Sequence, residues 1–460
     1  MMRSYLKPLL LAAVAGLGLM GGTRTVSAET LADALVAAYR NSHLLEQNRA
    51  TLRAADEEVA DAVASLRPVV KWGMEFSTSR CNMPYCSGQW SDLSGALAIT
   101  WEWTLFDFGR GKLGVGIQKE TVLATRAALL SAEQDVLLSA VQAYAEAKAS
   151  AEQVAINENS VRVISEQLKA AQDRFDVGEV TRTDVSLAEA SLAGARAALA
   201  AAQGQYKAAR EAYKAAIGHY PDRLASLPRA PQLPKSSAEA SAVALRQHPV
   251  IKQVQHQVAA ADLGVELAAA QRLPTVGTSA KLADPEYIGR SATLSLSVGG
   301  PIYSGGAIAS AHRKAVANRD KARAGLSQAA VQVAQGVANA YAMIEVYRAQ
   351  IRAYDEQIQA ADIAYQGVKE EATLGARTTL DVLDAEQDLL SARASRINAE
   401  ADLQVGYYQL LAAMGLLTVE DLKLGIPTYD PAAYYNAVQN APLSAQGESL
   451  DRVLRAIGKK

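Results

Sequence analysis

The sequence is poor in aromatic side chains, which make up 6% of its residues although hydrophobic residues make up 50%. Alanine is the most frequent of the hydrophobic residues that are not aromatic, and such a composition favours closely packed helices. A net charge of −2 leaves no excess of basic residues for a nucleic-acid partner. Beyond the N-terminal segment no stretch approaches 18 uninterrupted apolar residues, which excludes a helical membrane protein but leaves a membrane barrel open.

Motifs of enzymes and cofactor sites are also missing. The five histidines have no metal-ligand spacing and lie in no Ser or Cys nucleophile motif. Gly111, Gly114 and Gly116 form a glycine-rich patch, but no Gly-Lys-Ser/Thr follows it, so a phosphate-binding loop is not expected. We therefore expect no catalytic residues, no metal and no cofactor. The histidines are His43, His219, His248, His256 and His312.

The first 28 residues have the pattern of a secretory signal peptide. Arg3 and Lys7 precede an apolar run, and the segment ends in Val26-Ser27-Ala28, a small-residue cleavage pattern. An anchored helix is the alternative, but the run is short for a membrane span. Cleavage after Ala28 would export the chain, and because no Cys follows the apolar run a lipid anchor is not expected.

The chain contains an internal duplication. The stretch from Gly109 to Gly218 recurs from Gly306 to Gly415 at a constant offset of 197 residues, and the segments ahead of each block repeat at an offset of 206. The difference places a nine-residue insertion between Pro68 and Gly109. We divide the chain into a first repeat (29–218), a linker (219–235), a second repeat (236–415) and a C-terminal tail (416–460), which we expect to lie on the surface of the helices.

Each repeat contains a segment in which apolar residues alternate with polar ones, the period of a strand. The alternation predicts two separate β-hairpins, at about 69–106 and 275–303, and so four strands. Their apolar face includes Trp72, Trp101 and Trp103, whereas Lys71, Glu75 and Glu102 lie on the other face. Four strands cannot close a barrel, so lipid contact would require strands from several chains. Soluble hairpins packed on helices are the alternative.

Two cysteines occur in the whole chain, Cys81 and Cys86, in a loop at the tip of the first hairpin. In an exported protein such a pair is expected to form a small disulfide. A zinc site is the less favoured alternative, because one isolated pair supplies too few ligands.

Both duplicated blocks predict long helical hairpins. Apolar positions spaced alternately by four and three residues run from Leu326 to Val368, which predicts a left-handed coiled coil. Helices of sixty-odd residues would be about 95 Å long. The turns are expected near 176–184 and 373–381, where Gly178 and Gly375 can end a helix and Thr–x–x–Asp sequences can cap the next. The strands then lie at the other end of the molecule.

An acidic stripe follows the second turn. Asp381, Asp384 and Asp388 stand at i, i+3 and i+7 and share one helix face. The first copy has Asp184, Leu187 and Ser191 at these positions. Taken alone, Asp381 can be a capping residue and the others a solvated face. In a closed ring of subunits the stripe would favour cations in a pore, with Arg377 as the nearest basic partner.

Taken together, these segments resemble the TolC-like outer-membrane channels of tripartite efflux and type I secretion. The resemblance covers nearly the whole mature chain, and its most specific part is the stretch from Gly375 to Ala385. The other matching motifs are Leu31-Ala32-Asp33-Ala34-Leu35 with Asn41, Leu66-Arg67-Pro68, and Leu105-Phe106-Asp107-Phe108-Gly109.

The resemblance implies an α+β membrane protein: a trimeric, 12-stranded outer-membrane β-barrel with four strands per chain, continued by a long α-helical coiled-coil barrel. Asp381, Asp384 and Asp388 would line the pore constriction, which Arg377 would lock through Thr183 and Asp184 of a neighbouring hairpin. Ala372 stands where the family often has an aromatic residue, which implies a looser closed state. Tip residues would dock a periplasmic adaptor protein. They are Val177, Gly178, Leu374 and Gly375.

In function, the resemblance implies a passive exit duct for protein secretion or multidrug efflux, opened by an inner-membrane ABC or proton-driven transporter. The alternative from another class is a soluble periplasmic coiled-coil scaffold. An enzyme is the third and least favoured interpretation.

Overall fold

The computed structural model describes residues 28–78, 94–285 and 290–439. Two predictions lie outside these ranges: the signal peptide up to its cleavage site, and the Cys81–Cys86 disulfide.

The duplication is visible in the lengths of the helices. In both copies the four helices contain 11, 22, 67 and 36 residues, in that order. The first copy consists of α1 (Leu31–Asn41), α2 (His43–Ala64), α3 (Arg110–Asp176) and α4 (Arg182–Ile217). The second consists of α5 (Ser237–Gln247), α6 (Pro249–Ala270), α7 (Ala307–Thr373) and α8 (Thr379–Met414).

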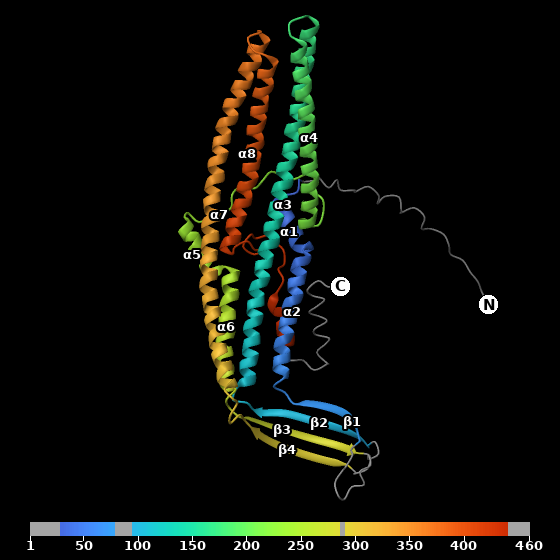
Figure 1. Ribbon diagram of the computed structural model, residues 1–460, viewed down its shortest axis with the longest axis vertical. Helices are drawn as coiled ribbons and strands as arrows, with labels where there is room; N and C mark the ends of the chain where they lie inside the picture. The colour runs from blue at the N-terminus through green and yellow to red at the C-terminus, as the bar shows by residue number, and fades with distance from the viewer. Residues whose placement is uncertain (1–27, 79–93, 286–289, 440–460) are drawn as a thin grey trace, which may run out of the picture.

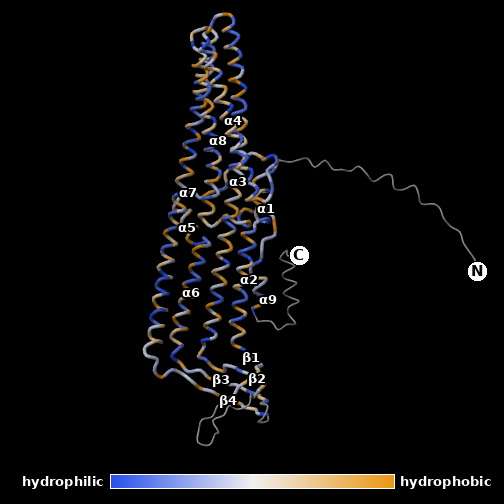
Figure 2. Tube along the Cα trace, turned by 45° about the vertical axis from the view of Figure 1, so that its right-hand side comes forward, coloured by the Kyte–Doolittle hydropathy of each residue, from blue (hydrophilic) through white to orange (hydrophobic). Residues whose placement is uncertain are grey.

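The molecule is a long rod with the sheet at one end (Figure 1). Helices α3 and α7 extend along the whole rod, and 67 residues correspond to about 100 Å of helix. In Figure 1, α4 and α8 lie beside the upper halves of these helices, and α2 and α6 beside the lower halves. Figure 2 shows hydrophobic and hydrophilic positions alternating along each helix, as expected for helices that bury one stripe. The two interhelical turns therefore lie at the end farthest from the sheet.

The four strands form one antiparallel sheet in the order β1-β2-β3-β4. The prediction of two separate hairpins was wrong, because β2 pairs with β3 from Ala96↔Pro285 to Phe106↔Val276. The second hairpin also ends earlier than predicted, at Gly299. Pro301 follows shortly after and has no amide hydrogen for the ladder. The strands are β1 (Val69–Ser77), β2 (Ser94–Phe106), β3 (Thr275–Pro285) and β4 (Ser291–Gly299).

One face of this sheet is apolar and exposed. Trp72 is 77% exposed and Leu294 79%, although both are large apolar side chains. Because residues directly opposite one another share a face, the pairing places these side chains on the same surface. An exposed apolar surface of this kind marks contact with a membrane or another protein. Other exposed members are Val70, Met74, Phe76, Leu97, Ile99, Trp103, Leu282, Leu296 and Val298.

The main hydrophobic core lies near the middle of the rod, where tyrosines at equivalent positions in the two copies hold the irregular segments. Tyr144 is fully buried, and its single hydroxyl proton is shared between the carbonyls of Glu29 and Ala225, at 2.9 and 3.0 Å. Its equivalent, Tyr341, donates to the carbonyl of Lys235 at 3.0 Å. Each phenol thus satisfies backbone acceptors in segments without helical hydrogen bonds.

The segment after α8 is more ordered than a surface tail. Leu417 and Val419 belong to the main core, and the buried Glu133 of α3 accepts a hydrogen bond from the backbone amide of Val419 at 2.7 Å. The short helix α9 (Pro431–Val438) then packs against α2 through Tyr434. The predicted tail is therefore part of the fold as far as residue 439.

A buried carboxyl group lies where this segment meets α2 and α3. Asp56 of α2 is completely buried, and neither of its carboxyl oxygens has a hydrogen-bond partner among the described residues. Burial raises the pKa of Asp56 to about 7, and the positive charge of Arg126 opposes that rise. Tyr429 and Tyr434 lie close enough for the negative charge of Asp56 to raise their own pKa values.

The raised pKa predicts a pH dependence of stability. The folded state retains the proton of Asp56 at pH values where the unfolded state loses it, so its contribution is full below about pH 4 and is lost as the pH rises through about 7. Asp56→Asn removes this dependence. We expect the unfolding free energy of the wild type to fall relative to this variant by about 3 to 4 kcal/mol between pH 4 and pH 8.

Denaturant unfolding followed by circular dichroism at both pH values measures this difference. Asp61→Asn is the matched control, because Asp61 is an exposed acid on the same helix. Equal pH dependence in all three proteins would contradict the prediction.

Candidate functional site

The two interhelical turns have the same backbone geometry. Helix α7 ends in a Schellman motif, in which the amide of Ala376 donates to the carbonyl of Glu371 at 2.9 Å and that of Gly375 to Ala372 at 3.2 Å. The first turn repeats these bonds around Gly178. Gly178 and Gly375 have φ angles of 81° and 78°, where a side chain would be strained. Glycine at both positions therefore explains why each hairpin turns within a few residues.

The helices that follow begin with the predicted capping boxes. The carboxylate of Asp381 accepts hydrogen bonds from the amide and hydroxyl of Thr378, at 2.9 and 2.8 Å. Asp184 accepts the same pair of bonds from Thr181, at 2.8 and 2.7 Å. These bonds hold the pKa of both carboxyl groups below the usual value. Asp381 and Asp184 are thus capping residues that keep a negative charge at the tip.

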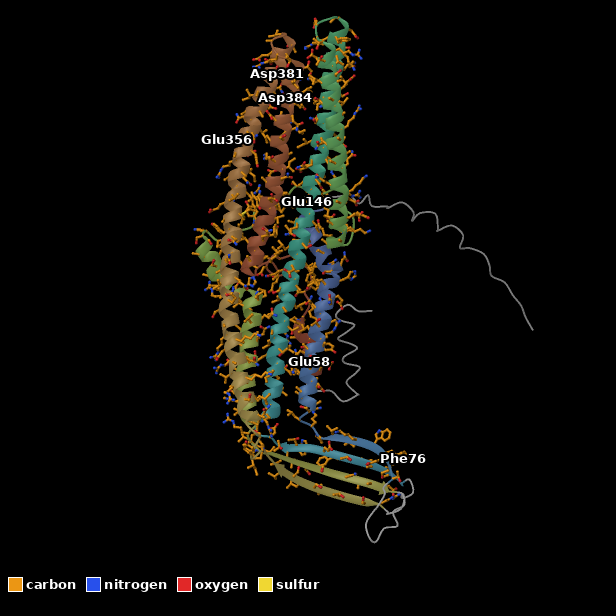
Figure 3. The ribbon with its side chains drawn as sticks, in the orientation of Figure 1. Glu58, Phe76, Glu146, Glu356, Asp381 and Asp384 are labelled. Carbon is orange, nitrogen blue, oxygen red and sulfur yellow. The ribbon has the colours of Figure 1, made fainter. Side chains whose placement is uncertain are left out.

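The rest of the acidic stripe points to solvent. Asp384 and Asp388 are exposed, and neither has an ion-pair partner among the described residues. Figure 3 shows Asp381 and Asp384 near the tip of α8, at the opposite end of the molecule from Phe76 of the sheet. The stripe is therefore a free acidic surface on the second hairpin, available to cations or to basic groups.

Arg377 is bound within its own turn in the single chain. Its Nε donates to the carboxylate of Glu371 at 2.8 Å, and this contact, with the charge of Asp381, raises the pKa of the guanidinium. No contact joins Arg377 to Thr183 or Asp184 of the same chain in the described structure. The lock through Thr183 and Asp184 of a neighbouring hairpin therefore stays a prediction.

A contact between the two tips was not foreseen from the sequence. Arg174, in the last turn of α3, donates from Nη1 to the carbonyl of Ala372 in the last turn of α7, at 3.3 Å. Below this bond, Leu383 of α8 joins a small apolar cluster with Ile164 and Leu192 of the first hairpin. Since the acceptor is a backbone carbonyl, no side-chain pattern pointed to this bond.

Ion pairs join the two helices of the second hairpin. Arg396 of α8 lies 2.5 Å from Asp355 of α7, and Arg393 lies 3.3 Å from Asp362. At the offset of 197, the residues equivalent to Asp362 and Arg396 are Ser165 and Leu199. No ion pair between α3 and α4 occurs in the described part of the first hairpin. This difference between the copies was readable from the duplication.

Apolar side chains project from both turns. Val177 is 72% exposed and Leu374 is 85% exposed, at equivalent positions next to Gly178 and Gly375. The glycines leave open space beside them. Each tip thus presents one exposed apolar side chain beside a glycine turn.

The sequence matches the profile of the family described as "Outer membrane efflux protein" over residues 34–219 and 240–416. The chain belongs to this family. The efflux protein BepC of Brucella suis is 35% identical over 441 residues, which cover 94% of this chain and 96% of BepC. The outer membrane protein TolC of Salmonella enteritidis is 25% identical over 433 residues, 90% of this chain and 87% of TolC.

Solved structures share the fold. The crystal structure of the CmeC outer membrane channel of Campylobacter jejuni matches with a TM-score of 0.75 at 16% identity, covering 90% of each chain. The chain therefore has the α+β channel-tunnel fold, and it is an outer-membrane channel protein of the efflux and secretion type. The scaffold alternative is not favoured, and the members of the family are channels rather than enzymes.

Helix α4 is long and apolar enough to cross a membrane by length and composition alone, which the test for uninterrupted apolar runs did not reveal. Its hydropathy comes mainly from alanine. In the structure α4 lies beside α3 (Figure 1). Ala188 and Leu192 of α4 pack against Ile164 of α3. Only 17% of the most apolar window of α4 is buried in the single chain, so packing on α3 covers a minor part of its apolar surface.

The capping geometry generates a prediction for the tip. Thr378→Ala removes the hydroxyl that caps α8 and one of the bonds that hold the carboxylate of Asp381. We expect amide hydrogen exchange over residues 374–382 to become about fivefold faster, which corresponds to the loss of about 1 kcal/mol from one N-cap. Exchange measured by mass spectrometry on the purified protein checks this.

Thr379→Ala is the matched control, because its side chain is one residue along the helix and makes no capping bond. Equal acceleration in both variants would mean that the capping box does not hold the tip.

Proposed function

We propose that three copies of this chain form one exit duct across the outer membrane and the periplasm. The observation that carries this proposal is the four-stranded sheet, which exposes an apolar face and has β1 and β4 as its edges. In lipid an open edge leaves backbone groups without hydrogen bonds, so the sheet must continue into other strands. Three chains would supply twelve strands, with the apolar face toward lipid and the polar face toward water.

The helical hairpins would continue this barrel as a tunnel. Three copies of the acidic stripe of Asp381, Asp384 and Asp388 would then surround the tunnel axis at its far end. The depressed pKa of Asp381 supports a permanent negative charge there. In the closed state Arg377 would exchange Glu371 for Thr183 and Asp184 of a neighbouring chain. With Ala372 in place of an aromatic residue, this closed state would be looser than is usual in the family.

A periplasmic adaptor would dock on the tips through Val177, Gly178, Leu374 and Gly375, whose exposure supports this role. An inner-membrane transporter, of the ABC or proton-driven type, would supply the energy. Opening would be a rigid-body movement of the hairpins that breaks the Arg377 contacts. BepC is named as an efflux protein, which favours efflux as the transport task of this chain. Cleavage after Ala28 would deliver the mature chain, residues 29–460, with its two repeats, to the periplasm.

Single-channel conductance tests both the duct and its entrance. Purified protein in a planar bilayer should give cation-selective currents that divalent or trivalent cations block from the helical side. In Asp381→Ala/Asp384→Ala we expect the block to weaken by at least tenfold, because the ring of carboxylates is removed.

Asp173→Asn is the control, because it removes an exposed acid from the same end of the molecule but outside the stripe. Protein that does not insert or conduct would refute the duct. If multivalent cations block the double variant as strongly as the wild type, the duct proposal stands but the acidic stripe does not form its entrance.

A further inference from the structure

The register of the sheet brings two lysines to one level on its polar face. Lys71 of β1 is opposite Thr100 of β2, Thr100 is opposite Lys281 of β3, and Lys281 is opposite Thr293 of β4. Opposite residues in antiparallel pairs share a face. The row that crosses all four strands therefore reads Lys-Thr-Lys-Thr, and we call it the lysine row.

The lysine row does not follow from the duplication. The two copies repeat at an offset of 206 in the segment before the insertion, which makes Gly277 the equivalent of Lys71. Lys281 instead follows Lys71 by 210 residues (281 minus 71). Only the pairing of β2 with β3 brings the two lysines level with each other.

The neighbouring rows of the polar face are uncharged or acidic. Toward the far end of the sheet the next row contains Gly73, Ala98, Ala283 and Ser291. Toward the helices the next row contains Glu102 with Val69, Ser279 and Ser295. The lysine row is thus a narrow basic band on this face.

Lys281 is the cation of this band that is not neutralised. Lys71 pairs with Glu102 at 3.0 Å, and both side chains are more than half exposed. Lys281 is exposed and has no ion-pair partner among the described residues, and threonines stand on both sides of it. A lysine on an edge strand can serve to prevent aggregation, which would account for Lys71. Lys281 lies on the inner strand β3, so that explanation does not extend to it.

We propose that the lysine row is an anion-binding band inside the barrel, which interacts with phosphate, sulfate or carboxylate groups of solutes that leave the channel. This proposal rests on the proposed trimeric duct. Threefold symmetry would place the three copies of Lys281 at one height in the barrel and the three copies of Lys71 at another, because barrel strands are tilted. Within one chain the two lysines are two strands, or about 10 Å, apart. Threonine hydroxyls between the lysines would add hydrogen-bond donors for an oxyanion.

The band would act as a weak, salt-dependent filter rather than as a tight site, because its lysines are exposed to water. It would have the opposite sign from the acidic stripe at the other end of the duct. Solutes would meet carboxylates where they enter and ammonium groups where they leave. A ring of charged side chains changes the preference of a pore for one sign of ion.

The test uses the full-length protein in a planar bilayer at low salt, with inorganic tripolyphosphate as the probe. We expect tripolyphosphate added on the sheet side to block the wild type, and roughly threefold to tenfold more probe to be needed for Lys281→Gln. The reversal potential of this variant in a KCl gradient should shift toward cation selectivity. Thr100→Lys, which adds a cation to the row, should strengthen the block.

Two controls separate charge from other effects. Lys281→Arg keeps the positive charge, and tripolyphosphate should block this variant as it blocks the wild type. Lys321→Gln removes an exposed lysine from α7, outside the sheet, and should also leave the block unchanged.

Channels that conduct normally but show equal block in the wild type and Lys281→Gln would overturn the anion-binding band and leave the duct intact. A block that is lost equally in Lys321→Gln would also overturn it, because the effect would not be specific to the row. Absence of any conductance would refute the duct, and the band with it.

Discussion

In lipid, every backbone N–H and C=O group of a sheet needs a hydrogen-bond partner within the protein. This constraint governs the architecture of this protein. Its four strands form one sheet with an exposed apolar face and two edges, and such a sheet is not stable in a membrane on its own. In the duct that we propose, copies of the same chain complete its membrane end. Helices α3 and α7 contain 67 residues each, about 100 Å, and place the interhelical turns at the end of the rod farthest from the sheet.

The internal duplication builds this architecture from two copies of one unit. Helices of identical length recur in both copies, each hairpin turns at a glycine in the left-handed conformation, and each following helix begins with a Thr-Asp capping box. Tyr144 and Tyr341 bind the irregular segments at equivalent places in the middle of the rod. The shared parts are thus those that define the shape of the unit.

The copies differ where charge is concerned. The acidic stripe beyond Asp381 and the ion pairs of Arg393 and Arg396 occur only in the second hairpin, whereas the first hairpin is held mainly by apolar contacts. Ion pairs therefore contribute to the contact between the two helices of the second hairpin, whereas none is found between the helices of the first in the described structure. The sheet has a separate charge pattern, with Lys71 and Lys281 level on its polar face. The acidic stripe and these two lysines thus lie at opposite ends of the rod.

Local patterns in the sequence were enough to predict the long helices, their turns, the capping boxes and the strands, because helical and strand periodicity and turn chemistry act between residues close in the chain. The duplication also made the acidic stripe of the second hairpin visible. Tertiary structure alone decided that the two hairpins join into one sheet, that Lys281 is level with Lys71, that Arg174 bonds to the carbonyl of Ala372, and that the segment after α8 completes the core. All four contacts join residues far apart in the chain, where local patterns do not act. Alternation tells which face a residue occupies but not its register with a strand some 180 residues away, and a backbone acceptor leaves no trace in the side-chain pattern.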